Sequence, residues 1–400
     1  MVVEFLAGNR ITLLNSGNEY FPVLLSAIES AQVEIYLESY IFANDAIGHA
    51  VAGALSRAAA RGVQVNVTVD GFGARNFRAD FLPRLTIAGV RAMFYRPEIS
   101  LFHLRRHRLR RLHRKLVVID ARVAFVGGIN IIDDNNAPEE MRPRYDYAVR
   151  IEGPALRQAH HAVRRMWEIV SWVNFKRRFR HTLPATPGCE IAGEQEAVFL
   201  IRDNIRHRND ILHAYITAIN AAQNEILIAN AYFLPGLRFG LALHAAARRG
   251  VQITVLLQGK TDHPLLRYAT QTLYAALLKA GIRIYEYEKS FMHAKVAVVD
   301  RLWATVGSSN IDPFSLLLAK EANLFVRNPA FAAELHASVR HAIASGAREM
   351  LADELTAHPW HIRALRWLSY ELVRMLVGLT GYGPKVWQVD AETPGPAGER

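Results

Sequence analysis

Two short segments of the chain carry the same reactive side chains in the same order. His113-x-Lys115 and His293-x-Lys295 each begin a run typical of a strand, LVVID or VAVVD. Residues i and i+2 of a strand share a face, so each histidine and its lysine point the same way. A neutral imidazole is a competent nucleophile near pH 7, and an imidazolium is a competent acid. The pairing therefore indicates nucleophilic and acid–base chemistry.

Both segments continue with the same residue types. Asp120 and Asp300 follow the lysines by five positions, where DAR and DRL are typical of turns. The next strand ends in small residues and then an asparagine: Gly127-Gly128 before Asn130, and Gly307-Ser308-Ser309 before Asn310. Small residues there allow close approach of a backbone or a tetrahedral phosphate. Lysine is not a usual zinc ligand, so we expect no metal, and we expect no cofactor.

The motifs belong to an internal repeat of four blocks. Residues 27–42 match 218–233, 61–71 match 249–259, 88–95 match 280–287, and 113–130 match 293–310. Tyr95 and His113 are 18 positions apart, but Tyr287 and His293 only 6, so the first half carries about 12 extra residues. They are mainly PEISLFHLRRHRLRRL. The repeat predicts a duplicated domain with a basic insertion before His113.

Hydrophobic runs predict the elements that position the motifs. EIYLESYIF, VQVNVTVDG and VRAMFY are typical of short buried strands, and the alanine-rich segment 46–62 predicts a helix that ends at Gly62. This alternation predicts an α/β fold with largely parallel pairing. A helix from about Pro154 to Val173 would close the first half.

Composition limits the remaining possibilities. The single cysteine, Cys189, excludes an internal disulfide and fits a reducing compartment. No secretory signal precedes the first repeat, and no run of about 18 apolar residues predicts a membrane span. A pI near 9.8 indicates an acidic partner, which could be nucleic acid, anionic lipid or a phosphorylated substrate. Charge alone does not choose among these.

On these motifs the chain resembles the phospholipase D superfamily, whose signature is HxKxxxxD followed by G-[GS]-x-N, present twice. The resemblance covers roughly residues 5–345. It implies two phospholipase D-like α/β domains in a pseudo-twofold arrangement, with one metal-independent active site at their interface. The implied catalytic set is His113, Lys115, Asp120, His293, Lys295 and Asp300. One histidine, here His113, would attack phosphorus to give a covalent phosphohistidine, and His293 would act as acid and base.

Further residues are expected to support this chemistry. Lys115 and Lys295 would hold the non-bridging oxygens, together with the phosphate-binding residues Asn130, Asn310, Gly128 and Ser308. Asp146 and Glu321 occupy equivalent positions of the two halves, and we expect them to orient the histidines. Asp120 and Asp300 are expected to lock the motif turns, as similar aspartates do in the superfamily.

Local segments narrow the resemblance. GNRITLLNSGNEYFPVLLSAI, NAYFLPGLRF and GSSNIDPFSLLLAKEAN are similar to bacterial cardiolipin synthases, above all the B type. This implies transfer of a phosphatidyl group from phosphatidylglycerol or phosphatidylethanolamine to phosphatidylglycerol. A phospholipase D that uses water is the nearest alternative, because the motifs do not distinguish the two acceptors. A nuclease is a further alternative. A binding protein on an inactive scaffold is disfavoured, because both motifs are intact.

The domain organisation follows from the repeat. We expect an amino-terminal phospholipase D-like domain over 1–182, a second over 183–345, a helical and membrane-associating extension over 346–386, and a disordered tail over 387–400. In the extension one predicted helical face carries leucines and the opposite face carries charges. The leucines are Leu365, Leu368, Leu372, Leu376 and Leu379, and the charges are Arg363, Arg366, Glu371 and Arg374. This pattern indicates an interfacial helix or one that packs on the protein's own core.

The basic insertion completes the predicted lipid contact. Apolar and basic residues alternate along it, which suits a headgroup–acyl boundary better than a nucleic-acid groove. We expect its arginines to bind lipid headgroups: Arg105, Arg106, Arg108, Arg110 and Arg111. NFKRRFRH (174–181) indicates lipid contact or a solvated helix end equally well. The expected partners are an anionic phospholipid bilayer and phospholipid substrates, with nucleic acid unlikely, at the cytoplasmic face of the bacterial inner membrane. The oligomeric state is left open.

Overall fold

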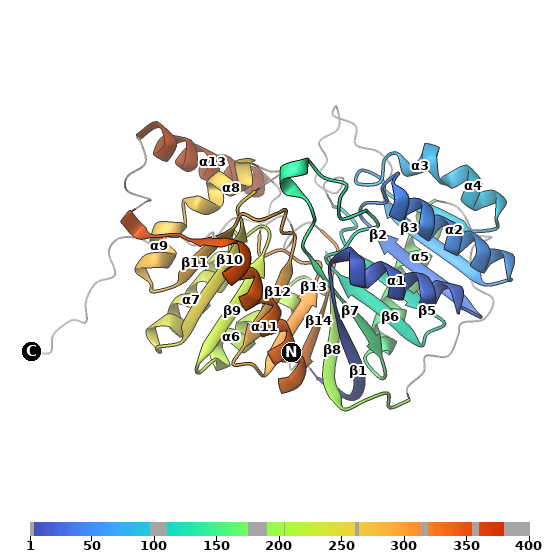
Figure 1. Cartoon of the computed structure of the whole chain (residues 1–400), viewed down its shortest axis with the longest axis horizontal. Helices are drawn as coiled ribbons and strands as arrows, with labels where there is room; N and C mark the ends of the chain where they lie inside the picture. Colours follow the sequence, from blue (N-terminus) through green and yellow to red (C-terminus); the bar gives the residue numbers. More distant parts are fainter. Residues whose placement is uncertain are drawn as a thin grey trace, which may run out of the picture.

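The computed structural model of the protein describes residues 4–96, 110–174, 190–203, 205–260, 264–312, 315, 319–353 and 360–379. Within these residues, fifteen strands form one sheet in the order β15-β11-β10-β9-β12-β13-β14-β8-β1-β7-β6-β5-β2-β3-β4. The sheet runs across the whole molecule and carries helices on both faces (Figure 1).

The first half contains the strands on one side of the sheet. These are β1 (Leu6–Asn15), β2 (Glu34–Ser39), β3 (Gln64–Asp70), β4 (Arg91–Tyr95), β5 (Leu116–Ile119), β6 (Val123–Gly127) and β7 (Tyr147–Glu152). Its helices are α1 (Ser16–Glu29), α2 (Ala46–Ala60), α3 (Phe77–Asp80), α4 (Leu82–Ile87), the 3-10 turn η2 (Glu139–Met141) and α5 (Leu156–Val173).

The second half repeats this order. Its strands are β8 (Gln195–Arg202), β9 (Glu225–Asn230), β10 (Gln252–Gln258), β11 (Arg283–Tyr287), β12 (Lys295–Val299), β13 (Trp303–Gly307), β14 (Glu321–Arg327) and β15 (Ala347–Glu349). Its helices are α6 (Asp210–Ala221), α7 (Leu237–Arg248), α8 (Pro264–Gln271), α9 (Tyr274–Lys279), α11 (Pro329–Gly346) and α13 (Trp360–Leu379).

The two halves are related by a pseudo-twofold axis at the centre of the sheet. From the centre outward, β1 is followed by β7, β6, β5, β2, β3 and β4, and β8 by β14, β13, β12, β9, β10 and β11. The central strands β1 and β8 pair antiparallel. The predicted duplication of an α/β domain is confirmed. The predicted limit between the domains, at 182 and 183, lies outside the described residues.

The local predictions hold around the first motif, and parallel pairing is confirmed for the three strands from which it was predicted, although it does not extend to the motif strands. β2, β3 and β4 lie within the predicted strand windows, and α2 ends just before Gly62, whose φ is +92°. Among the described strands, parallel pairing is confined to β2–β3–β4 and β9–β10–β11. The motif strands form hairpins instead, because the three-residue turns 120–122 and 300–302 reverse the chain, with φ near +50° at Asp120-Ala121 and Asp300-Arg301. A turn this short joins only antiparallel strands.

Three clusters of buried apolar side chains hold the layers together. One lies beneath α1, α2 and α4, and a second beneath α6, α7 and α9. The third cluster is common to both halves, because α5 and α11 pack on the opposite face over strands of both repeats. Trp167 of α5 and Phe331 of α11 are among its largest buried side chains. A shared core fixes the two motif strands relative to each other.

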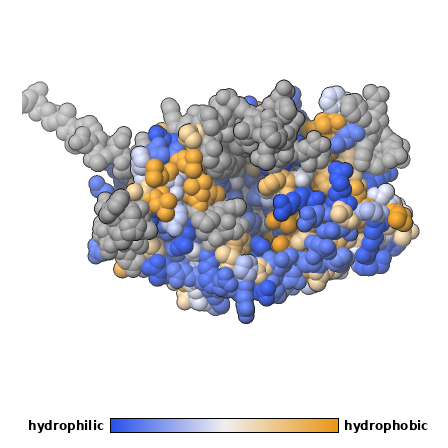
Figure 2. Space-filling view, turned by 90° about the horizontal axis from the view of Figure 1, so that it is seen from above, coloured by the Kyte–Doolittle hydropathy of each residue, from blue (hydrophilic) through white to orange (hydrophobic). Residues whose placement is uncertain are grey.

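The chain after α11 adds an edge strand and a helix. β15 pairs antiparallel with β11, so the predicted extension begins inside the sheet. α13 packs on α8 with Tyr370 and Val373 buried, whereas Leu365, Leu368 and Leu372 are 40–56% exposed. Apolar side chains gather over this end of the molecule (left in Figure 2). The helix therefore both packs on the protein's core and presents the predicted leucine face to the surface.

One residue of α13 was placed on the wrong face by the helical pattern. Arg366 is buried, and its Nε–H donates to Gln271 Oε1 (3.0 Å), because α8 offers an amide partner on that side. The side chains of Arg363, Leu376 and Leu379, and the tail 387–400, lie outside the described residues. In the part of the chain that is described, no helix combines the length and apolar character needed to cross a membrane.

Candidate active site

The two histidine–lysine pairs stand at the starts of β5 and β12. His113 and Lys115 lie at the entry to β5, and His293 and Lys295 at the entry to β12. The alternation of side chains turns both members of each pair to the same face. The histidine side chains are 15–16% exposed, and both lysines are buried. Each pair thus combines a slightly exposed imidazole with a buried ammonium group.

Each histidine is hydrogen-bonded to a carboxylate of the other half. His113 Nδ1–H donates to Glu321 Oε1 (2.9 Å), and His293 Nδ1–H donates to Asp146 Oδ2 (2.8 Å). An ionised carboxylate can only accept, so the proton lies on Nδ1. This leaves Nε2 of a neutral imidazole with a free electron pair. The two motifs and the two carboxylates therefore form one site at the interface of the halves.

Short parallel bridges between the halves produce this crossed arrangement. His113 N donates to Lys320 O (3.0 Å), and Lys320 N donates to Arg111 O (2.8 Å). In the same way, His293 N donates to Tyr145 O (2.8 Å). Lys320 and Tyr145 each precede a carboxylate, so the bridge sets that carboxylate beside the opposite histidine. The strand register is equivalent in the two halves. Gly127 pairs with Ala148, two residues after Asp146, and Gly307 pairs with Asn323, two residues after Glu321.

The small residues after β6 and β13 pack against these carboxylates. A Cβ atom on Gly128 would lie 2.3 Å from Asp146 Oδ1, so a side chain cannot be placed there without moving the carboxylate. At the equivalent position, Ser308 is buried and its Oγ–H donates to Glu321 Oε2. The two positions predicted to bind phosphate thus contact the carboxylates that hold the histidines.

The two lysines carry the positive charge of the site. Lys115 Nζ donates to His113 O (2.7 Å), and Lys295 Nζ donates to His293 O. Burial lowers the pKa of Lys115 to about 7; nearby Glu321 raises it and Lys295 lowers it. Burial raises the pKa of Asp146 to about 6, against the opposing effect of Lys295. Burial also lowers the pKa of His113, although Glu321 opposes this shift.

The two asparagines have different surroundings. Asn130 Oδ1 accepts from Ile41 N (3.0 Å). Asn310 Nδ2 donates to Ser315 Oγ (3.3 Å), and Asn310 Oδ1 is buried without a hydrogen-bond partner among the described residues. Both side chains are nearly buried, at 7% and 4% exposure. The amide of Asn130 is therefore the better placed of the two to keep donors available for a phosphate.

The two motif aspartates lie at the far ends of the motif strands. Asp120 accepts from the backbone N–H groups of residues 32, 33 and 34 (2.8–2.9 Å). Asp300 accepts from those of residues 223, 224 and 225 (2.8 Å). Each aspartate lies five positions along the chain from its lysine, roughly 16 Å in an extended strand. They hold the hairpin turns to β2 and β9, and they do not reach the histidines.

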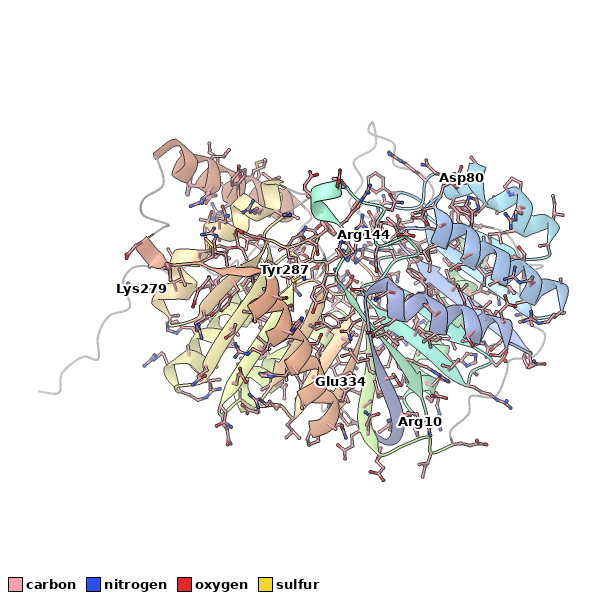
Figure 3. All side chains as sticks on the ribbon, in the orientation of Figure 1. Arg10, Asp80, Arg144, Lys279, Tyr287 and Glu334 are labelled. Carbon is pink, nitrogen blue, oxygen red and sulfur yellow. The ribbon has the colours of Figure 1, made fainter. Side chains whose placement is uncertain are left out.

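Aromatic and cationic groups surround the histidines. The Tyr40 ring packs edge-on against His113 (5.0 Å between centroids), and the Phe291 ring stacks on His293 (6.0 Å). The guanidinium of Arg144 lies 4.8 Å from the centre of the Phe291 ring. Arg144 and Tyr287 lie at the junction of the halves in Figure 3. No cluster of potential metal ligands occurs among the described residues.

Only two of the five arginines predicted to bind headgroups lie among the described residues. Arg105, Arg106 and Arg108 lie outside the described residues. Arg111 forms an ion pair with the buried Asp70 (3.5 Å) and lies over the Phe72 ring. Arg110 lines a separate pocket behind β5. Arg111 is therefore held by groups of the protein itself.

Comparison with known proteins assigns the family. The model of a family described as "Cardiolipin synthase, PLD-like domain" matches residues 24–167 and 215–343, one match in each half. The chain belongs to this cardiolipin synthase, PLD-like family. Both matches include a motif strand with its histidine and lysine.

Curated members of the family are similar over almost the whole chain. Cardiolipin synthase B of Shigella flexneri is 38% identical over 98% of this chain and 95% of its own length. The enzyme of the same name from Escherichia coli K12 is 37% identical over the same shares. Cardiolipin synthase 1 of Bacillus cereus is 32% identical over 79% of this chain and 63% of its own.

Solved structures show the same fold. A phosphatidylserine synthase from Haemophilus influenzae superposes with a TM-score of 0.68, covering 96% of this chain and 97% of its own, at 13% identity. Polyphosphate kinase from Porphyromonas gingivalis gives a TM-score of 0.55 over 93% of this chain and 53% of its own. At these identities the likeness concerns the fold alone.

Several residues of the family site were not predicted from the sequence. The bridges through Lys320 and Tyr145 depend on contacts between segments about 150–200 residues apart. The crossed pairing of histidines and carboxylates has the same origin. The hydrogen bond from Ser308 to Glu321 joins residues of two neighbouring strands. One signal was available, since both carboxylates stand at the start of a strand at equivalent points of the repeat.

Proposed function

We propose that this protein is a cardiolipin synthase that transfers a phosphatidyl group from phosphatidylglycerol or phosphatidylethanolamine to phosphatidylglycerol. One observation carries the proposal: two imidazoles, each fixed by a carboxylate of the opposite half, stand with two buried lysines in one site. These groups can catalyse a double displacement at a phosphodiester. The curated relatives named cardiolipin synthase support the choice of substrates.

The first displacement forms a covalent intermediate. Nε2 of neutral His113 attacks the phosphorus of the donor lipid, and the bond from phosphorus to the leaving alcohol oxygen breaks. His293, in its protonated form, gives a proton to that oxygen. The product is a phosphatidyl group on His113 Nε2, with the leaving alcohol released. Burial keeps the pKa of His113 below its ordinary value, which favours the neutral, nucleophilic form.

The second displacement regenerates the enzyme. Neutral His293 takes the proton of the acceptor hydroxyl group, and the alkoxide oxygen attacks phosphorus as the bond to His113 breaks. Lys115 and Lys295 hold the non-bridging oxygens in both steps, with the Asn130 amide as an additional donor. A single positioned donor of this kind contributes roughly 10²–10³-fold to such rates. Water in place of the lipid alcohol would give phosphatidic acid.

Association with a membrane surface is part of the proposal. The leucine face of α13 is exposed, with Trp367 at 56% and Met375 at 56% beside it. An exposed apolar face on a helix suits the boundary between headgroups and acyl chains. We propose peripheral binding to the cytoplasmic face of the bacterial inner membrane, with anionic phospholipids as partners and nucleic acid as an unlikely one.

The test supplies purified protein with labelled phosphatidylglycerol in vesicles, with and without phosphatidylethanolamine. Cardiolipin is the expected product, and His113→Ala and His293→Ala are the controls. Acid quenching should trap labelled lipid on the wild-type protein and not on His113→Ala. Phosphatidic acid as the sole product would establish the hydrolase alternative. Nicking of plasmid DNA without cardiolipin would overturn the proposal, and an adduct lost only in His293→Ala would reverse the two roles.

A further inference from the structure

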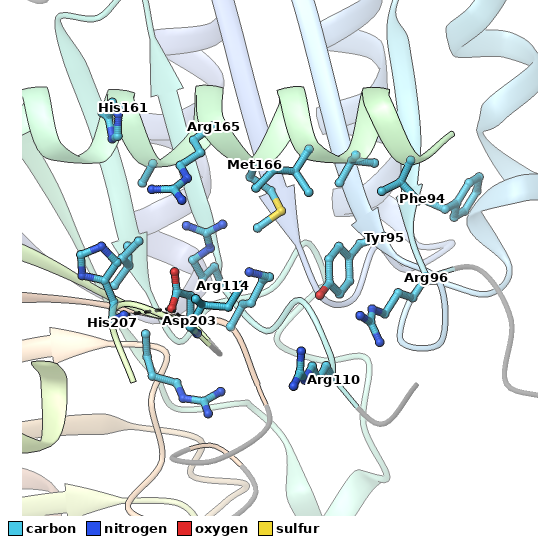
Figure 4. Close-up of a pocket in the computed structure, with 18 of the residues that line it drawn as sticks. Phe94, Tyr95, Arg96, Arg110, Arg114, His161, Arg165, Met166, Asp203 and His207 are labelled. Carbon is cyan, nitrogen blue, oxygen red and sulfur yellow. Dashed lines mark hydrogen bonds between the residues drawn. The ribbon is translucent and has the colours of Figure 1, made fainter. Parts of the chain in front are cut away.

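A second pocket lies behind the strand that carries His113. It has a volume of about 290 Å³ and opens between α5, the end of β4, the end of β8 and residues 110–114. We call it the α5 pocket. Its cationic lining residues are Arg96, Arg110, Arg114, Arg165, Arg202 and Lys320. Figure 4 shows Arg110, Arg114 and Arg165 reaching the same space from different elements.

The α5 pocket is distinct from the catalytic site, although the two share a strand. His113 and Lys115 face the catalytic site, so Arg114 between them faces the opposite side of the strand. Lys320 and Glu321 diverge in the same way, since Glu321 bonds to His113 and Lys320 lines the pocket. Neither motif histidine and neither motif lysine is part of the lining. No step of the transfer reaction uses this pocket.

Its cations are only weakly compensated. Among the described lining residues Asp203 is the single carboxylate, and it already accepts from the backbone N–H groups of residues 205, 206 and 207 (2.8–2.9 Å). Arg114 is paired with the buried Glu38 (3.0 Å). Arg96 Nη1 is buried without a hydrogen-bond partner among the described residues. Burial, together with Arg114, lowers the pKa of Lys320 to about 8. Cations crowded in this way attract an anion.

The second half shows that the fold does not require such a pocket. At the pseudo-symmetric place Tyr145 stands where the first half has Lys320, and Ala294 where it has Arg114, whereas Tyr287 corresponds to Tyr95. The rings of Tyr145 and Tyr287 stack there (5.5 Å), and Tyr145 is hydrogen-bonded to Tyr147. One copy of the scaffold therefore fills this space with aromatic rings, whereas the other leaves it hollow and lines it with cations.

The remaining wall of the α5 pocket is apolar and leads to the surface. Met166, Ile169, Val170 and Val173 line it from α5. Ile169 and Val173 are 42% and 58% exposed, and Ile205 at the rim is 78% exposed. A volume near 290 Å³ accommodates a headgroup but not two acyl chains, which would have to run out along this wall. A cationic base with an apolar exit matches one phospholipid molecule.

We propose that the α5 pocket binds one anionic phospholipid that does not itself react, with its phosphate among Arg114, Arg165 and Lys320 and an acyl chain along α5. Such a lipid would link the segment that carries His113 to the bilayer, on the side of the strand opposite the catalytic site. Free phosphate would bind to the same cations without contacting the apolar wall. Substitution of Ile169 should therefore weaken the binding of the lipid but not that of free phosphate.

Photolabelling tests the proposal independently of turnover. The probe is a short-chain phosphatidylglycerol with a diazirine on one chain, used below its micelle concentration on the full chain. Residues labelled in peptides from Leu156–Val173 are expected, and unlabelled short-chain phosphatidylglycerol should compete while phosphatidylcholine should not. Arg165→Gln with Lys320→Gln should reduce this labelling by about tenfold or more. Arg122→Gln with Arg248→Gln removes two exposed charges elsewhere and should change it less than about twofold.

A further variant separates lipid from free phosphate. Ile169→Asn should lower lipid labelling by about tenfold and leave competition by inorganic phosphate against a headgroup-only probe unchanged. Labelling that is confined to peptides of the catalytic site, or that is equal in the pocket variant and in its charge-matched control, would overturn the proposal. If inorganic phosphate displaces the label on α5 as effectively as phosphatidylglycerol does, the pocket is an anion site without lipid selectivity. That result would also contradict the proposal.

Discussion

The hydrogen bonds around Glu321 make a specific prediction about His113. Glu321 is fully buried; Oε1 accepts from His113 Nδ1–H (2.9 Å), and Oε2 accepts from Ser308 Oγ–H and also lies 3.1 Å from His113 Nδ1. Ser308 Oγ already accepts from Ala322 N–H (3.0 Å), so in Glu321→Gln the arrangement that keeps the hydrogen bond from Ser308 turns the amide oxygen to Ser308 and the NH₂ group to His113. Nδ1 must then accept, the ring proton moves to Nε2, and the nucleophilic electron pair is lost.

Two effects set the size of the defect. Loss of a charge-assisted hydrogen bond costs roughly 1.5–3 kcal/mol, or about 10–150-fold in rate. The wrong tautomer adds to this, since the corresponding change in a hydrolase triad lowers kcat about 10⁴-fold. We expect kcat for cardiolipin formation to fall roughly 10³–10⁴-fold in Glu321→Gln. Adding Ser308→Ala frees the amide to turn its oxygen to His113, so the double variant should recover about tenfold or more.

The assay follows cardiolipin formation from labelled phosphatidylglycerol in mixed micelles, with ¹⁵N NMR of the histidine rings to report the tautomer. Thermal unfolding of each variant shows whether the fold is kept. Ser308→Ala alone is the control and should lose only a small part of the activity. If Glu321→Gln keeps more than half of the wild-type kcat, the carboxylate does not fix the tautomer. Equal activity of the single and double variants would refute the part assigned to Ser308.

Three further predictions concern pH, the turns and the membrane. Burial raises the pKa of Asp146 to about 6 and lowers that of Lys115 to about 7. As the pH falls below about 6 His293 loses its charged partner, and as it rises above about 7 the free enzyme loses a phosphate-binding cation. A profile of kcat/KM over pH 5–9 should therefore be bell-shaped, and a flat profile would contradict this. Asp120→Ala deprives three backbone N–H groups of an acceptor and should lower the free energy of unfolding by about 2–4 kcal/mol in urea titrations; no change would mean that the turn is held by other contacts. Leu368→Ser with Leu372→Ser should weaken co-sedimentation with phosphatidylglycerol vesicles by about tenfold or more. The equally exposed pair Leu241→Ser with Leu302→Ser is the control, and equal losses would exclude a specific contribution of α13.

The repeat made much of the fold predictable, because periodic local signals mark each element. The runs at 34–42, 63–71 and 90–95 contain β2, β3 and β4, and the helix predicted from about Pro154 is α5 (Leu156–Val173). The alternation of strands and helices predicted the pairing direction of β2, β3 and β4 but not that of the motif strands. The latter depends on the three-residue turns that begin at Asp120 and Asp300, whose positive φ angles are a property of backbone conformation rather than of composition.

The site was predictable as a set of residues but not as an arrangement. Equivalent positions in the repeat identified Asp146 and Glu321, yet the exchange of carboxylates between halves arises from bridges through Lys320 and Tyr145. The α5 pocket has no periodic signal, since its cations come from segments as far apart as Arg96 and Lys320. Arg114 gave a partial indication, because a residue between two that face a site must point behind it.

The departures from symmetry around the two histidines support different roles for them. Ser308 donates a hydrogen bond to Glu321 and so helps to hold that carboxylate against His113, which suits a histidine whose Nδ1 must remain a donor throughout attack on phosphorus. Gly128 offers Asp146 no such donor, and burial raises the pKa of Asp146 to about 6. A carboxylate that titrates near neutral pH leaves its histidine free to gain and lose a proton, as an acid and base must. These differences support the proposed assignment of His113 as the nucleophile and His293 as the proton carrier.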